Sequence, residues 1–143
     1  MSAPFHHIAC CMDESESALR ALDESRTLRA LGEGRLTLLH VVQYPLPFAT
    51  GYGAQVNPAD LMAAAEKWMG TISADVREGN EVVLQGYPAS EACRWAAENA
   101  VDLMVVASHR NLAQRLALGS FAHYLVNHAP CPVLAMRSAP AAP

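Results

Sequence analysis

Lysine is nearly absent from this sequence, which has one lysine and nine arginines among its 143 residues. The arginines are scattered along the chain and form no basic run, and the formal net charge is -4 at pH 7. Nonspecific binding to nucleic acid depends on clustered positive charge that neutralises backbone phosphates. The composition therefore argues against such a binder, and we expect no nucleic-acid partner.

Long apolar runs are missing as well. No run approaches the ~18 residues that a membrane-spanning helix needs. The N-terminal stretch MSAPFHH is polar and lacks the apolar segment of a signal peptide. We therefore expect a cytoplasmic protein without membrane contact. Because thiols stay reduced in the cytoplasm, we expect free cysteines, with small buried side chains at Cys10 and Cys11.

Metal-binding and catalytic motifs are also absent. The cysteines form no CxxC pair, and adjacent His6 and His7 would point to opposite faces of a strand. His123 and His128 fall on different faces of a helix, and His40 is expected to be a hydrogen-bonded core histidine. The chain lacks GxGxxG, Walker A and GxSxG motifs. The sequence therefore predicts no metal, no catalytic residue and no enzyme.

What the chain does have is a regular alternation of strand and helix patterns. Strands with apolar residues on both faces are typical of a parallel sheet that helices cover on each side. Right-handed crossovers then limit the topology to a doubly wound, Rossmann-like α/β fold. We expect one domain over residues 1–143, with 138–143 as a disordered tail. The predicted strands are 6–12, 35–42, 81–86, 101–108 and 131–136, and helices follow the first four, starting near Asp13, Pro58, Pro88 and Gly119.

Ligands of such sheets bind beyond the carboxyl ends of the strands, where the strand order reverses. Asp13 follows the first strand, Val41 ends the second, and the 107–120 loop leads from the fourth strand to Gly119-Ser120. The free N–H groups of a helix start attract phosphate. Ser120 has a simpler interpretation as an N-cap, and Asp13 with Glu16 fits a capping box, with Ser15 as a second candidate cap.

These segments resemble the universal stress protein family. The resemblance rests on HVV at the end of the second strand, DLMVVASH, and LALGSFAHYLVNHAPCPVLAMR, and it covers His7 to Arg137. It implies the strand order 3-2-1-4-5 and a homodimer that meets through the fifth strand. An apolar, uncharged edge strand favours such pairing. The dimer edge is then formed by Pro132, Val133, Leu134, Ala135 and Met136.

Nucleotide-binding members of that family carry Gly-x-x-Gly-x9-Gly-Ser, and in them the equivalents of Asp13 and Val41 contact the adenosine. Here Ala107 and Arg110 replace the first two glycines, and eight residues separate Arg110 from Gly119. The resemblance thus implies a degenerate site that binds ATP or AMP weakly, with Arg110 either clamping the phosphate or filling its space. The candidate nucleotide-binding residues are Met12, Asp13, Val41, Ala107, His109, Arg110, Gly119, Ser120 and Phe121.

Two alternatives remain at this stage. A branch of the family lacks the motif and is thought not to bind ATP, so the chain could be a dimeric protein-interaction module with an unknown partner. The second alternative is slow ATP hydrolysis, for which no positioned base or metal-ligand set is visible. The leading prediction is a cytoplasmic, homodimeric stress-response module that regulates by binding.

Overall fold

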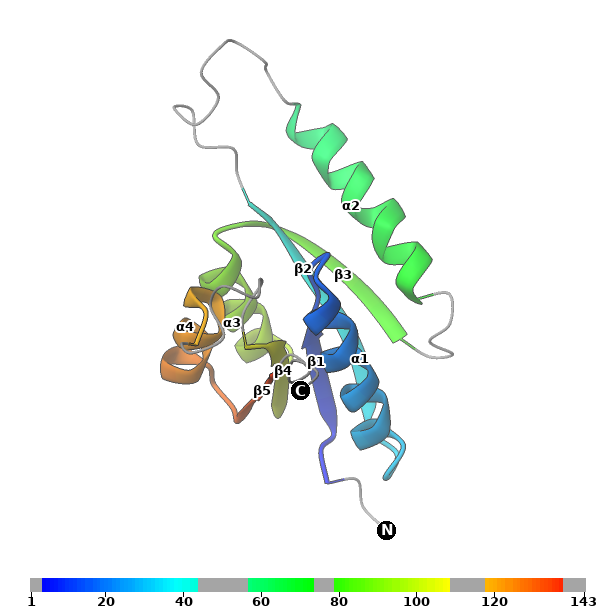
Figure 1. The fold of residues 1–143 in the computed structure, drawn as a ribbon, viewed down its shortest axis with the longest axis vertical. Coiled ribbons are helices and arrows are strands. Elements are labelled where there is room, and N and C mark those ends of the chain that lie inside the picture. The colour runs from blue at the N-terminus through cyan, green and yellow to red at the C-terminus, as the bar shows by residue number, and fades with distance from the viewer. Residues whose placement is uncertain (1–3, 44–56, 74–78, 109–117, 138–143) are drawn as a thin grey trace, which may run out of the picture.

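The computed structural model describes residues 4–43, 57–73, 79–108 and 118–137 of the chain. Within them, one parallel five-stranded sheet has the order β3-β2-β1-β4-β5 and carries helices on both faces (Figure 1). This confirms the predicted fold class and strand order. The elements are β1 His7–Cys11, α1 Glu16–Arg29, β2 Arg35–Gln43, α2 Pro58–Ser73, β3 Gly79–Gly86, α3 Pro88–Glu98, β4 Leu103–Ala107, α4 Ser120–His128 and β5 Val133–Met136.

Strand β1 lies in the middle of the sheet, and all five of its residues are buried. It pairs with β2 on one side and β4 on the other, so Ile8 has Leu36 and Leu103 as its two neighbours. Because successive side chains point to opposite faces, alternate residues of β1 enter two separate cores. This explains why its sequence is continuously apolar rather than alternating.

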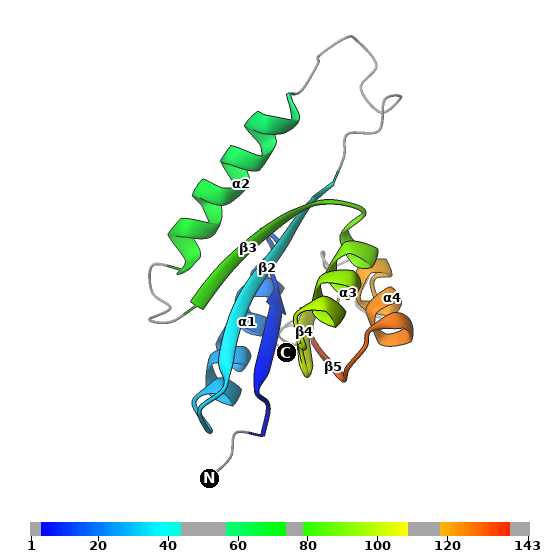
Figure 2. The same ribbon diagram turned by 180° about the vertical axis from the view of Figure 1, so that it is seen from behind.

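The two cores lie on opposite faces of the sheet. Ile8 and Cys10 pack with α1 and with Met69 of α2 on one face, while Ala9 and Cys11 pack with α3 and α4 on the other. Figure 2 shows α3 and α4 in front of the sheet and α1 behind it. The α3 face is built from small residues such as Ala92, which is fully buried, so the helix approaches the sheet closely.

Several local predictions need correction. Ser15 alone is the N-cap of α1, where its hydroxyl accepts a hydrogen bond from Ala18 N–H. The carboxylate of Asp13 instead accepts a hydrogen bond from Ser15 N–H, so Asp13 supports the turn and does not cap the helix. The glycines at 32 and 34 predict a helix end near them, but α1 ends at Arg29, and hydrogen bonds from Leu31 to Leu28 and from Gly32 to Arg29 tighten the turn that follows. The run of small residues after Pro88 predicts one apolar helix face that includes Ala97 and Ala100, but Ala97 of α3 and Ala100, which follows the helix, are both exposed.

Strand β5 is shorter than predicted and begins at Val133. Pro132 precedes it but still takes part in the sheet, since its carbonyl accepts the N–H of Met104. The predicted tail 138–143 lies outside the described residues. Among the helices that the structure describes, none has the length and apolar character to cross a membrane.

A polar cluster around the buried His7 lies at the amino ends of the strands. The His7 ring lies 2.8 Å from Thr37 Oγ1 through Nε2 and 2.9 Å from the Asn99 carbonyl through Nδ1. Asp102 accepts the N–H groups of His6 and His7, at 2.7 and 2.9 Å. Burial by itself would raise the pKa of Asp102, but these hydrogen bonds outweigh it and lower the pKa.

Stability should decrease in acid because of His7. Burial lowers the pKa of His7 below its usual 6.5, and the Arg35 guanidinium adds to this effect, while the hydrogen bond to Asn99 opposes it. The unfolded chain then binds the proton more readily than the folded one. We expect the contribution of His7 to the free energy of unfolding to be complete above pH 6.5 and to decrease as the pH falls below that value. Urea unfolding between about pH 7.5 and 5.5 measures this change. His7→Gln should flatten this dependence.

His123→Gln is the matched control, because His123 is exposed on α4. It should keep the pH dependence of the unaltered protein. If His7→Gln folds and shows the same pH dependence as the unaltered protein, His7 is not the responsible group.

Candidate functional site

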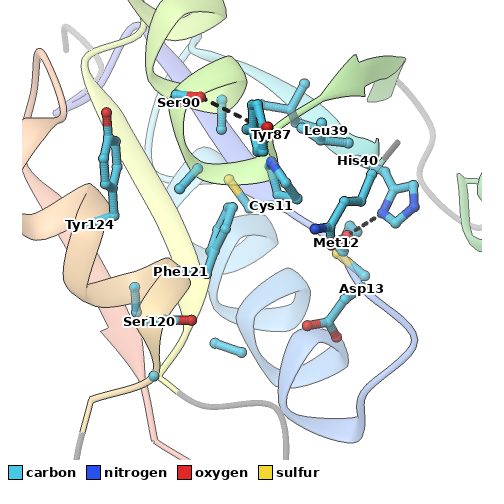
Figure 3. A pocket seen from close by; sticks show the side chains of 18 of the residues that line it. Cys11, Met12, Asp13, Leu39, His40, Tyr87, Ser90, Ser120, Phe121 and Tyr124 are labelled. Carbon is cyan, nitrogen blue, oxygen red and sulfur yellow. Dashed lines mark hydrogen bonds between the residues drawn. The ribbon is translucent and has the colours of Figure 1, made fainter. Parts of the chain in front are cut away.

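A pocket of about 710 Å³ opens at the carboxyl ends of the strands, between β1 and β2 on one side and the starts of α3 and α4 on the other. Its volume falls in the range of about 300–1,000 Å³ usual for small-molecule sites. Figure 3 shows side chains from all of these elements around it. The lining residues are Cys11, Met12, Asp13, Leu39, His40, Val41, Gln43, Tyr87, Pro88, Ala89, Ser90, Ala92, Ala107, Ser108, Gly119, Ser120, Phe121, Ala122 and Tyr124.

The turn after β1 is held by two strong contacts to β2. The N–H of Met12 donates to the Leu39 carbonyl at 2.7 Å, which extends the strand pairing by one residue. The Nδ1–H of His40 donates to the Met12 carbonyl, also at 2.7 Å, since a carbonyl can only accept. The His40 ring is further fixed edge-on against Trp68 of α2, with ring centroids 5.0 Å apart. The Met12-Asp13 turn is therefore placed rigidly at the pocket edge (Figure 3).

A second pair of contacts fixes the start of α4. Gly119 N–H donates to the Ser108 carbonyl at 2.7 Å, and Ser108 N–H donates to the Met136 carbonyl at 2.8 Å. These bonds join the end of β4, the end of β5 and the start of α4. Ser108 and Gly119 are consequently held together.

Helix α4 begins with donor groups that its own hydrogen bonds do not use. Its N-cap is Gly119, and the first N–H to bond back along the helix is that of His123, which donates to Gly119. The N–H groups of Ser120, Phe121 and Ala122 therefore have no intrahelical acceptor. The interpretation of Ser120 as the N-cap is wrong: Ser120 is the first helical residue, and its side chain is exposed beside the pocket.

The floor of the pocket is apolar. Leu39 and Val41 of β2 and Cys11 of β1 point to the face that α3 and α4 cover. Burial raises the pKa of Cys11 well above that of an ordinary thiol, so this sulfur is a neutral, apolar surface. Phe121 is half-buried against the same core. This floor suits a flat, uncharged part of a ligand, whereas the start of α4 suits an anionic part.

The wall opposite α4 is the sharp turn from β3 into α3. Gly86 has φ 144°, a conformation that glycine adopts without strain. Tyr87 follows, and Pro88 is the first residue of α3. A Cβ on Gly86 would lie 2.7 Å from Glu91 Cγ, so this turn also brings the chain close to α3.

The structure brings together most of the residues that the sequence points to. Of the nine candidates, seven line the pocket, and the remaining two, His109 and Arg110, lie outside the described residues. No metal-binding group of three or more His, Cys, Asp or Glu occurs within the described ranges. The seven that line the pocket are Met12, Asp13, Val41, Ala107, Gly119, Ser120 and Phe121.

Sequence reasoning missed the lining residues of the β3–α3 turn. Tyr87 and Ser90 carry no motif, and only the packing of α3 beside β2 brings them to the pocket. The prediction for His40 is correct in its hydrogen bond but wrong in its place, because the residue is half-buried and lines the pocket. In the sequence, His40 lies two residues before the end of the predicted strand 35–42, and this closeness to the strand end was the available signal.

Comparisons with known proteins agree on one family. The family model described as "Universal stress protein family" matches residues 4–137. "Universal stress protein A homolog 2" of Coxiella burnetii is 31% identical over 122 residues, covering 81% of this chain and 83% of that protein. The structure of UspA from Lactobacillus plantarum has a TM-score of 0.76 at 23% identity, covering 96% of this chain and 99% of that one.

A further structure in this set contains a ligand. A universal stress protein family protein from Arabidopsis thaliana was crystallised with AMP bound. It has a TM-score of 0.63 at 16% identity and covers 94% of this chain and 92% of its own. At that identity the likeness shows the fold alone.

A side chain at Gly86 should destabilise the turn. We expect Gly86→Ala to lower the free energy of unfolding by about 1–3 kcal/mol, because a left-handed backbone and the contact with Glu91 both oppose a Cβ. Urea unfolding at pH 7.5 measures this. Gly70→Ala is the control: a Cβ there meets nothing within 4 Å, and alanine favours the helix. Equal stability of the two variants would contradict the account of this turn.

Proposed function

Since the chain belongs to the universal stress protein family, we propose that its pocket binds an adenine nucleotide, AMP or ATP, with weak affinity. The observation that supports this most directly is the start of α4. There the N–H groups of Ser120, Phe121 and Ala122 lie without intrahelical acceptors beside a cavity large enough for a small molecule. Such a helix start binds phosphate through its N–H groups and its dipole.

In this arrangement the phosphate lies at Ser120, and the adenosine extends over the apolar floor toward β2. Asp13 and Val41 contact the adenosine there, as they line the pocket at the ends of β1 and β2. The part of the pocket lining that the structure describes contains no lysine or arginine. We propose that the neutral N–H donors and the hydroxyl at the start of α4 hold the phosphate, and this makes the binding weak. Arg110 follows two residues after Ser108 in the sequence, and its contribution remains a prediction.

We further propose that the protein acts in the cytoplasm by binding rather than by catalysis. The described residues contain no group of three or more His, Cys, Asp or Glu that could hold a metal ion. A bound nucleotide would then act as a signal that changes what the protein contacts, and the protein partner remains unknown.

The homodimer that we propose uses the outer edge of β5. The carbonyls of Pro132 and Met136 accept hydrogen bonds from β4, so the even-numbered residues of this strand direct their backbone groups inward. Because successive residues of a strand direct their backbone groups to opposite sides, the N–H groups of Val133 and Ala135 face the open edge. Leu134 is half-buried and packs against the core on the α1 face, while its backbone groups point toward β4.

Nucleotide binding can be tested by calorimetric titration of the full chain with AMP and with ATP. We expect heat of binding at millimolar nucleotide, and a dissociation constant about tenfold higher for Ser120→Ala, because one charge-assisted hydrogen bond to phosphate is lost. Thr27→Ala is the control, since Thr27 is exposed on α1 and its hydroxyl bonds to Asp23. It should bind like the unaltered protein.

Two outcomes would count against this proposal. If neither nucleotide gives heat or a thermal shift at millimolar concentration, the chain is better explained as a protein-interaction module. If binding occurs but Ser120→Ala leaves the affinity unchanged, the phosphate lies elsewhere than at α4.

The dimer can be tested by light scattering. The unaltered protein should show twice the mass of the 15.4 kDa chain. Ala135→Pro should shift it toward the monomer, because proline removes an N–H from the open edge while leaving the bonds to β4 intact. Ala135→Val retains the N–H and should remain dimeric. A folded Ala135→Pro protein that stays dimeric would rule out pairing through β5.

A further inference from the structure

Tyr87 stands out among the residues of the pocket. Its side chain is 69% exposed, more than any other large hydrophobic residue in the described part of the chain, where the next is Leu31 at 61%. It nevertheless lines the pocket, at the lip formed by the β3–α3 turn (Figure 3). An exposed aromatic ring at the edge of a pocket can pack against a bound ligand, and the apolar surface that it then buries favours binding.

The backbone of Tyr87 is held firmly. Gly86 before it has a conformation suited to glycine, and Pro88 after it begins a helix. The Tyr87 carbonyl accepts a hydrogen bond from Glu91 N–H at 3.0 Å and another from the Ser90 hydroxyl at 3.3 Å. The ring is therefore presented from a rigid turn, which reduces the entropy lost when a ligand packs against it.

The two other Phe and Tyr rings of the pocket, like the His40 ring, already have partners. Phe121 is half-buried against the core, and Tyr124 stacks on His128 with ring centroids 4.1 Å apart and planes at 21°. Tyr87 has no ring contact of this kind within the described residues. Of the three, Tyr87 is the ring with the most surface left for a ligand.

The sheet places Tyr87 at the end of the pocket opposite the phosphate donors. In the order β3-β2-β1-β4-β5, the end of β3 is three strand spacings from the end of β4, about 14 Å. Figure 3 shows Tyr87 and Ser120 on different sides of the pocket, with Cys11 between them. A ligand with phosphate at α4 that lies across the apolar floor directs its far end to the lip at Tyr87.

We propose that the Tyr87 ring covers the base of the bound nucleotide and makes the pocket selective for purines. This inference rests on the nucleotide binding proposed above. Stacking on an aromatic face strengthens with the size of the base, so a purine gains more than a pyrimidine, and a sugar phosphate without a base gains nothing.

The test compares three ligands by calorimetric titration of the full chain: AMP, CMP and ribose 5-phosphate. The unaltered protein should bind AMP more tightly than CMP. Tyr87→Ala should raise the dissociation constant for AMP about tenfold, reduce the preference for AMP over CMP, and leave binding of ribose 5-phosphate unchanged. A merely structural role of Tyr87 would weaken all three ligands alike.

Two further variants complete the experiment. Tyr87→Phe keeps the ring and should keep both the affinity for AMP and the preference for it. Leu31→Ala removes another exposed apolar side chain, one that does not line the pocket, and should bind all three ligands like the unaltered protein.

The outcomes separate this inference from the proposed function. If the unaltered protein binds AMP and Tyr87→Ala binds AMP equally well, or loses affinity for ribose 5-phosphate as well, the role of Tyr87 is overturned while nucleotide binding stands. If the unaltered protein binds no AMP, both proposals fall together.

Discussion

The central strand β1 is the constraint on which the rest of the molecule depends. All five of its residues are buried, and it supplies side chains to the cores on both faces of the sheet. Its pairing with β2 and β4 sets the register of both neighbours. Because the strands are parallel, their carboxyl ends meet at one edge. The hydrogen bonds from Met12 to Leu39 and from His40 to Met12 then shape that edge into the wall of a pocket.

The two ends of the sheet contrast in how their polar groups are used. At the amino ends, the His7 ring and the Asp102 carboxylate are hydrogen-bonded to neighbouring groups. At the carboxyl ends, the N–H groups at the start of α4 have no intrahelical acceptor, and the Tyr87 ring lies largely in water. Satisfied groups favour stability, whereas unsatisfied donors and uncovered apolar surface favour binding. This difference is why we assign function to one end only.

Much of the fold was predictable because its signals are local. Apolar runs over β1 and β4 are continuous since both faces of those strands are buried, and the apolar stripe of α2 contains Met69, which is fully buried. The helix starts were less certain. Ser15, not Asp13, caps α1, and Gly119, not Ser120, caps α4, because the residue that takes the cap depends on where the preceding loop turns. In the site, His40 was assigned to the core. Strand periodicity predicts which face of the sheet a residue lies on, but it does not predict how close the residue lies to a pocket at the end of the strand.

The sequence by itself determined the α/β class, the family, and the position of Asp13 and Gly119 at the carboxyl ends of the strands. This was possible because strand and helix periods and the order of the motifs are properties of neighbouring residues. Tertiary structure decided which side chains meet across the pocket. Tyr87 and Ser120 are far apart in the chain and share no motif, and they face one pocket only because α3 and α4 pack side by side on the same face of the sheet. Such contacts depend on helix packing over β2 and β1, a long-range property that no single segment of the sequence encodes.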